Sequence, residues 1–447
     1  MKSLKRGSRL ITLMISVFII GMIVLIAKIQ MEASFYISNS GSRNLGYIYD
    51  RNGDIIFDDN AENGQYPDGY FKDLGNLIGD ASGQMTNTLV AKNIEKLSNY
   101  SFTSGITYKG GKAAIYSTLS HEANEAVYSA FGDKDGCAIA YNYKTGEILV
   151  CVSRPSVDPL KGYEDLAEGS LLCKAFYKTV PGSTQKIATL ISAVETMGMD
   201  ALMEKSFTCN GVYTNNTGLD IVCHNEYGHG TQNIREAFAN SCNPFFAQLV
   251  EDSGWSLANI EDCYKKLGYS VNGSEETEFS INGIISAKAS TTLEDKNEFN
   301  TQWSCIGQGT SLVSPCQLMM WQSAIANESG KSTMPYLIDH VTNVNGRTVE
   351  NASTNYSEQL FSSHTASEVK DIMLENGLNY TGKIPGYTLG IKSGTAQVKD
   401  GKEENSLLTG FVDDKDFPIA FAILIENRES YDVSTEYIAS VILDSLS

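Results

Sequence analysis

Strand-like segments near both ends of the chain enclose a long stretch with a helical pattern, and this arrangement limits the possible folds. Runs rich in β-branched and apolar residues occupy positions 138–143, 147–153, 388–398, 406–412 and 417–426. The first two are joined by Lys144-Thr145-Gly146, which predicts an antiparallel hairpin. The residues between the two groups have mainly helical periodicity. The sequence therefore predicts an α+β fold with one antiparallel sheet flanked by helices.

The N-terminus has the pattern of a membrane anchor. Residues 10–27 are uncharged and almost wholly apolar, and the run is long enough to cross a bilayer as a helix. No small-x-small cleavage site follows, so the pattern favours an uncleaved anchor over a signal peptide. The basic residues before it should stay in the cytoplasm: Lys2, Lys5, Arg6 and Arg9. We expect a cytoplasmic tail over residues 1–9, a transmembrane anchor over 10–28 and the rest of the chain outside the cell.

The remainder divides into a small segment and a large one. Residues 29–110 are too few and too polar for a large domain and are interpreted as a membrane-proximal pedestal. Two short β-prone runs around Asn52-Gly53 predict a hairpin within it. Residues 111–447 are predicted to form the main domain.

Charge and composition exclude some classes of protein. The 447 residues are 42% hydrophobic and 19% charged, which is typical of a globular protein. The formal net charge of -19 repels phosphate backbones, so nucleic acid is not expected as a partner. We predict no cofactor.

The nine cysteines are an odd number, so at least one must be unpaired or pair with another chain. Cys209 and Cys223 flank a polar stretch and could form a disulfide, or they could be buried free thiols. The two could also bind zinc with His224 and His229, but the spacing matches no compact zinc finger. No metal site is therefore predicted.

Ser183 and Lys186 form a pair that could act as nucleophile and base. Apolar residues at positions 187, 190, 191, 194 and 197 fall on one helical face and predict a buried helix beginning near Ser183. A separation of three residues places both side chains on one side of that helix. Such a lysine can deprotonate a serine if burial and a second cation lower its pKa. A helix N-cap followed by a solvated lysine would have the same residues.

Ser241-Cys242-Asn243 is predicted to form a tight turn between two helices. Asn243 is a suitable N-cap for the second helix, and Pro244 is a suitable first residue. Ser241 could pass a proton to a leaving amine, and Asn243 could hold a substrate amide. Capping alone would also explain Asn243.

Lys392-Ser393-Gly394-Thr395 lies in a run that otherwise alternates like a strand. This places Ser393 and Thr395 on the same face, where two hydroxyls beside a lysine could bind a carboxylate. Gly394 would allow another segment to approach the backbone closely. An ordinary polar edge strand would have the same pattern.

The order and placement of these three motifs resemble the signature of penicillin-binding proteins and serine β-lactamases. The chain is similar in particular to class B penicillin-binding proteins, the monofunctional D,D-transpeptidases that cross-link peptidoglycan. Further similar segments are residues 46–53, Tyr66-Pro67, Gly228-His229-Gly230, Gly307-Gln308-Gly309, Val313-Ser314-Pro315 and Leu408-Thr409-Gly410-Phe411. The resemblance implies the penicillin-binding transpeptidase fold, with an all-helical subdomain beside the sheet.

The resemblance also implies a catalytic mechanism. A donor stem peptide ending in D-Ala-D-Ala would acylate Ser183 and release D-alanine, and an acceptor amine would resolve the acyl-enzyme. Lys186 would be the base, Ser241 and Lys392 would relay the proton, and Asn243 would complete the catalytic group. β-Lactams, which mimic the donor terminus, would be covalent inhibitors.

Substrate-binding roles follow from the same resemblance. The backbone amides of Ser183 and Thr395 would form the oxyanion hole. Ser393, Gly394 and Thr395 would bind the terminal carboxylate. Many family members have threonine at the position of Ser393, but the hydroxyl is retained.

Other functions remain open from the sequence alone. Water as the acceptor would make the protein a D,D-carboxypeptidase or a β-lactamase. Residues 375–379 match the Glu-x-x-Leu-Asn element of class A β-lactamases but lie too late in the chain, just before Lys392. A non-enzymatic β-lactam sensor or scaffold is a further alternative, although few residues precede the anchor for signalling. Class B enzymes commonly work beside a SEDS-family glycosyltransferase, which is the expected membrane partner.

Overall fold

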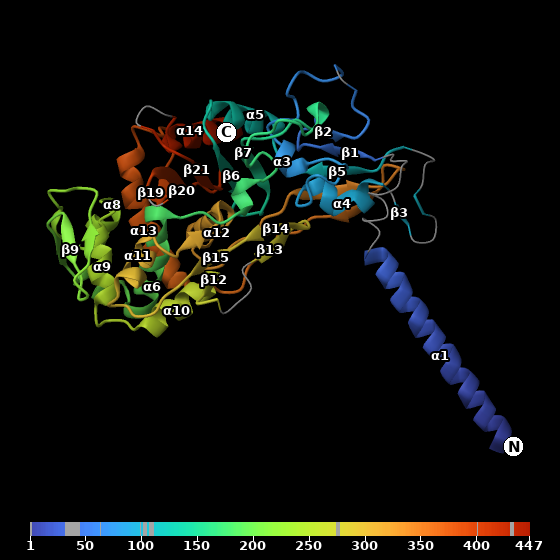
Figure 1. The fold of residues 1–447 in the computed structure, drawn as a ribbon, viewed down its shortest axis with the longest axis horizontal. Coiled ribbons are helices and arrows are strands. Elements are labelled where there is room, and N and C mark those ends of the chain that lie inside the picture. Colours follow the sequence, from blue (N-terminus) through green and yellow to red (C-terminus); the bar gives the residue numbers. More distant parts are fainter. Residues whose placement is uncertain are drawn as a thin grey trace.

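A five-stranded antiparallel sheet lies at the centre of the computed structural model (Figure 1). Its strand order is β19-β20-β21-β6-β7, so strands from the two ends of the main domain lie side by side. The strands are β6 (Gly136–Asn142), β7 (Ile148–Arg154), β19 (Leu389–Val398), β20 (Glu403–Val412) and β21 (Ile419–Ile425). All five strands predicted from the sequence are confirmed.

The structure describes residues 2–31, 45–62, 64–98, 100–101, 105–106, 111–273, 278–399, 401–429 and 433–447.

Helices cover both faces of this sheet because its side chains are apolar on both. Cys137, Ile139 and Tyr141 of β6 belong to one core, whereas Ala138 and Ala140 belong to the other. The second core is covered by α5 (His121–Ala130) and α14 (Thr435–Leu446). The first contains the helices α6 (Lys186–Met197), α12 (Pro315–Ala326) and α13 (Ser363–Gly377). Every residue of α12 is buried, as expected for a helix that lies within a core.

The stretch between the two groups of strands contains more than helices. Its other helices are α7 (Met199–Met203), α8 (Ile234–Ala239), α9 (Asn243–Glu251), α10 (Leu257–Lys266) and α11 (Phe299–Ile306). Its short strands are β8 (Phe207–Cys209), β9 (Val212–Thr214), β10 (Asp220–Val222), β11 (Gly230–Gln232), β12 (Tyr269–Val271), β13 (Glu278–Ile281), β14 (Ile284–Ala287), β15 (Ala289–Thr291) and β16 (Leu312–Val313). The subdomain is therefore mainly helical but not all-helical. These strands have two to four residues each, too few to establish a period.

A second sheet joins the predicted pedestal to the main domain. Its order is β18-β17-β5-β1-β2, built from β1 (Tyr47–Tyr49), β2 (Ile55–Asp58), β5 (Ala114–Ser117), β17 (Ile338–Thr342) and β18 (Thr348–Asn351). The hairpin around Asn52-Gly53 is confirmed, since β1 pairs antiparallel with β2. The sheet contains strands from both sides of residue 110, so the boundary placed there between pedestal and main domain remains a prediction.

Short elements complete the pedestal. They are α3 (Gly75–Ile78), α4 (Leu89–Leu97), β3 (Tyr100–Ser101) and β4 (Gly105–Ile106). Residues 32–44 and 107–110, at the two ends of the predicted pedestal, lie outside the described residues.

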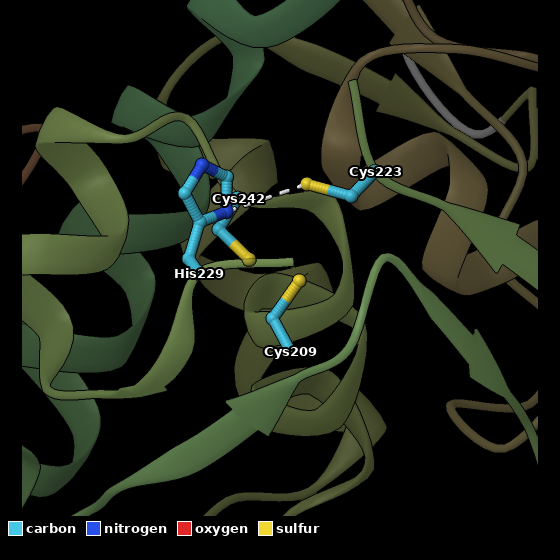
Figure 2. A group of neighbouring side chains, drawn as sticks. All are labelled: Cys209, Cys223, His229 and Cys242. Carbon is cyan, nitrogen blue, oxygen red and sulfur yellow. Dashed lines mark hydrogen bonds between the residues drawn. The ribbon is translucent and has the colours of Figure 1, made fainter. Parts of the chain in front are cut away.

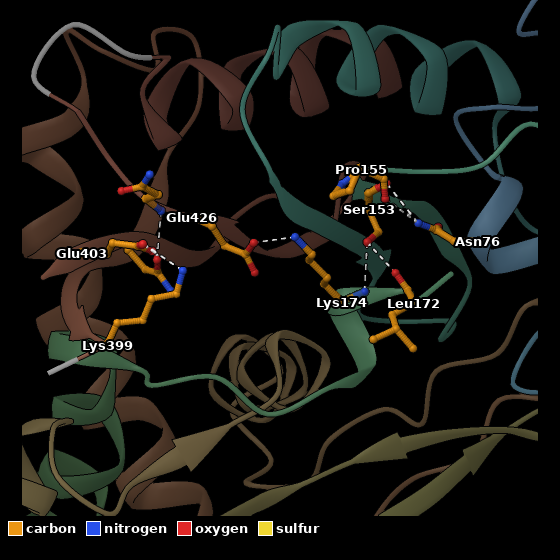
Figure 3. A network of polar contacts seen from close by, with 10 residues as sticks. Asn76, Ser153, Pro155, Leu172, Lys174, Lys399, Glu403 and Glu426 are labelled. Atoms are coloured by element: carbon orange, nitrogen blue, oxygen red, sulfur yellow. Dashed lines mark hydrogen bonds and ion pairs between the residues drawn. The ribbon is translucent and has the colours of Figure 1, made fainter. Parts of the chain in front are cut away.

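Polar contacts of Asn76 join the predicted pedestal to the main domain (Figure 3). The Asn76 side chain on α3 donates to the carbonyl oxygens of Ser153 and Pro155, at 3.2 Å each. The Ser153 hydroxyl donates to the carbonyl of Leu172 and accepts from the amide of Lys174, both at 3.0 Å. These bonds satisfy polar groups that would otherwise be unpaired in the interior.

The first element, α1 (Lys2–Met31), is drawn apart from the body in Figure 1. Its stretch Ile11–Ile29 is long and apolar enough to cross a membrane, and none of it is buried in the structure. The helix is compatible with the membrane anchor predicted over residues 10–28.

Candidate active site

Ser183 and Lys186 lie at the start of the buried helix that the sequence predicts. A single 3₁₀ turn, η3 (Gly182–Gln185), carries Ser183 and leads directly into α6. The Thr184 hydroxyl fixes this turn by donating to the Pro181 carbonyl at 2.7 Å. Lys186 Nζ lies 2.8 Å from Ser183 Oγ, so the two are within direct proton-transfer distance.

The surroundings of Lys186 favour a neutral amine. Its side chain is fully buried, and Nζ donates to the Ser241 carbonyl at 2.8 Å and to Asn243 Oδ1 at 2.7 Å. Burial and the nearby charge of Lys392 lower the pKa of Lys186 well below its ordinary value. A neutral amine that faces a serine hydroxyl can act as its general base.

The predicted turn between two helices is confirmed, and it is strained at Ser241. The residue lies between α8 and α9 with φ at 51°, a left-handed conformation that is costly for any residue but glycine. The prediction that Asn243 caps the second helix is wrong. The helix begins at Asn243 itself, and Cys242 occupies the N-cap without a side-chain capping bond. Pro244, one residue later, is equally compatible with the first helical turn.

Asn243 is therefore available for other contacts. Its side-chain nitrogen donates to the Val222 carbonyl at 3.0 Å, and its oxygen accepts from Lys186. These bonds fix the amide between the base and the neighbouring strand β10.

Lys392 reaches the same turn from β19. Its side chain is 1% exposed, and Nζ donates to Ser241 Oγ at 3.0 Å and to the Ser393 carbonyl at 2.9 Å. Burial lowers the pKa of Lys392 to about 7. Ser241 Oγ also lies 3.4 Å from Lys186 Nζ, so one hydroxyl contacts both lysines.

The strand β19 is at the edge of the central sheet and lies directly against η3. A Cβ atom added to Gly394 would lie 2.9 Å from the Pro181 carbonyl oxygen and 3.1 Å from the Ser183 amide nitrogen. A side chain at this position would thus push the strand away from the nucleophile. Gly182, with φ at 53°, lies equally close to β19 from the other side. A Cβ atom added to Gly182 would lie 2.5 Å from the Thr395 carbonyl oxygen.

Two residues that support β19 were not identified from the sequence as site residues. The Tyr380 hydroxyl lies 2.8 Å from Ser393 Oγ, and Asn376 donates to the Ile391 carbonyl at 2.8 Å. Asn376 belongs to the run that resembles a β-lactamase element, and its role here is to hold the strand. Gln308, in the Gly-Gln-Gly segment, donates to the Thr395 carbonyl at 3.4 Å.

A cleft of about 720 Å³ opens over these groups. It is lined by Ser183, Asp220, Val222, Cys223, His224, Ser241, Asn243, Phe299, Trp303, Gln308, Ser393, Gly394, Thr395, Gln397 and Glu404. The structure thus brings all eight predicted site residues together. Six line the cleft, and the two buried lysines contact it through Ser183 and Ser241. Such a site can activate a serine for attack on a carbonyl group.

Comparisons with known proteins agree with this geometry. The family model described as penicillin binding protein transpeptidase domain matches residues 136–444. Stage V sporulation protein D of Bacillus subtilis is 30% identical over 330 residues, 69% of this chain and 48% of that protein. Peptidoglycan D,D-transpeptidase PbpA of Mycolicibacterium smegmatis is 25% identical over 352 residues, 73% of this chain and 69% of that protein. The match thus spans about half the length of the first relative.

A solved structure has the same fold. It is the penicillin G acyl-enzyme complex of penicillin-binding protein A from M. tuberculosis, with a TM-score of 0.74 and 19% identity. The alignment covers 91% of this chain and all of that one. Because the family model spans more than half of the sequence, the chain belongs to the transpeptidase family of penicillin-binding proteins, in the class B group that its motifs indicate.

Proposed function

We propose that this protein is a peptidoglycan D,D-transpeptidase that acts through an acyl-enzyme on Ser183. The observation that carries the proposal is the 2.8 Å contact between Ser183 Oγ and the buried amine of Lys186. The names of relatives such as PbpA support the reaction, and the acyl-enzyme of penicillin-binding protein A supports inhibition by β-lactams.

In the first half-reaction, Ser183 Oγ attacks the carbonyl between the two D-alanines of a donor stem peptide. Lys186 takes the hydroxyl proton as the new ester bond forms. Ser241 then delivers its hydroxyl proton to the leaving amine of D-alanine. Lys392, whose Nζ lies 3.0 Å from Ser241 Oγ, replaces that proton. In the second half-reaction, an amine from another stem peptide attacks the ester and the protons move in reverse.

The edge strand β19 would hold the donor. Ser393 and Thr395 line the cleft, and hydroxyl groups of this kind are suited to the terminal carboxylate. The amides of Ser183 and Thr395 would stabilise the oxyanion. Loss of one donor of this kind typically costs about 10²–10³ in rate.

Intact-protein mass spectrometry after benzylpenicillin treatment tests the nucleophile. We expect one adduct on wild-type protein, mapped to the peptide with Ser183, and none on Ser183→Ala. Ser192→Ala is a matched control, because Ser192 is buried on the same helix outside the cleft and should leave labelling intact. Unlabelled wild-type protein, or undiminished labelling of Ser183→Ala, would refute the assignment.

The choice of acceptor is tested separately. With a D-Ala-D-Ala donor and an amino-group acceptor peptide, we expect the cross-linked product to exceed the hydrolysed one. Rapid turnover of a chromogenic cephalosporin would instead assign water as the acceptor.

We also propose that α1 anchors the protein in the bacterial cell membrane with the catalytic domain outside. The apolar stretch Ile11–Ile29 and the basic residues before it support this single-pass topology. Protease added to intact spheroplasts should digest the catalytic domain; full protection would contradict the topology. A SEDS-family glycosyltransferase is the proposed membrane partner, and failure to co-purify after cross-linking would count against it.

A further inference from the structure

Three thiols and one imidazole meet beside the catalytic turn (Figure 2). The ligand atoms of Cys209, Cys223, His229 and Cys242 all lie within 4.8 Å of one another. The three cysteines are buried and His229 is partly buried. Among the described residues, this is the one group of three or more His, Cys, Asp or Glu side chains close enough to share a metal ion.

The separation of Cys223 and His229 suits a tetrahedral ion. With Zn–S near 2.3 Å and Zn–N near 2.0–2.1 Å, two sulfur ligands lie about 3.8 Å apart, and a sulfur and a nitrogen about 3.6 Å apart. Cys223 Sγ lies 3.5 Å from His229 Nδ1, close to this value. Three thiolates and one imidazole form a ligand set that Zn²⁺ commonly occupies in closed structural sites.

The four ligands come from separate segments that backbone hydrogen bonds hold in place. Cys209 ends β8, and its carbonyl accepts from the amide of His229 at 3.0 Å. The amide of Cys223, just after β10, donates to the Gly211 carbonyl at 2.8 Å. The amide of Cys242 donates to the Ala237 carbonyl at 3.0 Å. The side chains therefore converge without a disulfide among the sulfur atoms.

Pairing of the thiols accounts for the cluster less well. All nine cysteines are free in the structure. A disulfide would use two of the three thiols here and leave the third, with the imidazole, without a function. Elsewhere, Cys151 and Cys173 lie 3.6 Å apart but belong to no group of three possible ligands among the described residues.

We propose that Cys209, Cys223, His229 and Cys242 bind one structural Zn²⁺ ion next to the active site. This set differs from the one weighed on the sequence, because Cys242 takes the place of His224. The exposed His224 side chain lines the cleft, with Nδ1 4.0 Å from Cys223 Sγ. The proposal replaces the expectation, drawn from the sequence, that the chain has no metal site.

The ion would support the strained catalytic turn. Cys242 stands between Ser241, with φ at 51°, and Asn243, and both neighbours contact Lys186. A metal bond to Cys242 would hold this turn against the two lysines. None of the catalytic side chains would be used as a ligand. This consequence rests on the proposed function, but the presence of the metal does not.

The first test is the metal content of the full-length protein, purified in detergent with a histidine-free tag and without chelators. We expect one zinc ion per chain by inductively coupled plasma mass spectrometry, and none in Cys209→Ala. Cys263→Ala is the matched control, because Cys263 is a buried free thiol on α10 outside the cluster and its variant should retain the ion. Equal zinc in wild-type and Cys209→Ala protein, or another metal in its place, would overturn the proposal.

A second test uses wild-type protein only, so it does not depend on the folding of a variant. Removal of the ion by a chelator should lower the melting temperature and slow acylation by penicillin about tenfold, and added zinc should restore both. Cobalt in place of zinc should give the visible absorption of a tetrahedral thiolate site. A disulfide between any two of the three cysteines, in freshly isolated protein alkylated before digestion, would overturn the proposal. Wild-type protein that is isolated without zinc and still labels with penicillin would refute only the metal site, whereas a zinc-bound protein without labelling would refute only the enzyme.

Discussion

At the scale of single residues, the main feature is the shared contact of Lys186 and Lys392 with one hydroxyl. Both amines are buried, and both lie within 3.4 Å of Ser241 Oγ. Two ammonium groups so close in a low-dielectric interior disfavour each other, so one of them is neutral near pH 7. The pair can therefore pass a proton across Ser241 with little change in total charge.

This coupling predicts the pH dependence of acylation. The reactive form has neutral Lys186 and protonated Lys392. The rate of penicillin acylation should therefore rise with pH, with a midpoint well below the ordinary lysine pKa, and fall again as Lys392 loses its proton near pH 7. The positive charge of Lys392 disfavours protonated Lys186, and in Lys392→Met this influence is lost. The midpoint should then move to higher pH, in addition to a lower maximal rate. Rates from timed mass spectrometry across the pH range would show this.

Lys383→Met, which removes an exposed lysine paired with Glu436, should leave the midpoint in place. A flat profile in the wild type would mean that Lys186 is not the base.

Tyr380 is expected to position Ser393 rather than to take part in proton transfer. Loss of its hydroxyl in Tyr380→Phe removes one hydrogen bond at 2.8 Å, worth about 1 kcal/mol. The apparent affinity for donor peptide or penicillin should fall about fivefold, while the maximal acylation rate and its pH profile remain unchanged. Tyr387→Phe, whose hydroxyl contacts Asp444, is the control. A changed pH midpoint in Tyr380→Phe would instead place this residue in the proton path.

At the scale of elements, the approach of β19 to η3 decides whether the site forms. In Gly394→Ala the new Cβ would lie 2.9–3.1 Å from three backbone atoms, so the strand must move outward. A shift near 1 Å typically costs about 10² in rate, and this shift is smaller, so we expect a loss of up to about tenfold in the acylation rate with the fold retained. Gly382→Ala, which has nothing within 4 Å of its Cβ, should acylate normally. Normal acylation by Gly394→Ala would show that this close approach is not required.

The elements that could be predicted from the sequence are those with a period long enough to detect. Strands β19 to β21 and the helix after Ser183 follow the alternation and the helical spacing of their residues. The three-residue strands β8 to β11 could not be predicted in this way, because such short runs carry no period. The N-cap of α9 was misplaced by one residue, since proline fits more than one position of a first helical turn.

In the site, too, some contacts could be predicted from local spacing and others could not. Ser183 and Lys186 are one turn apart on a helix, so local geometry was enough to pair them. Their contact with Lys392 was implied only by the family resemblance. Tyr380 and the convergence of Cys242 with Cys209 depend on tertiary packing, which no local pattern records.

At the scale of the whole molecule, α1 is not part of either hydrophobic core of the described structure. None of the stretch Ile11–Ile29 is buried against the rest of the described structure. Removal of residues 1–31 should therefore release the protein from membrane pellets while penicillin labelling of Ser183 persists. Sedimentation and fluorescent-penicillin gels would measure both. Loss of labelling in a folded, released protein would mean that α1 contributes to the site.

Under the proposed membrane topology, the sheet that joins the predicted pedestal to the main domain sets an order on folding during export. Behind an N-terminal anchor β1 and β5 are delivered early, but β17, the partner of β5, begins only at Ile338. Until then β5 has an open edge, which is a site for aggregation or proteolysis. The second sheet therefore stays incomplete until most of the chain has been translocated. A chain that ends before Ile338 should be degraded in the cell even though its anchor and its nucleophile are intact, and its stable accumulation in pulse-chase experiments would contradict this order.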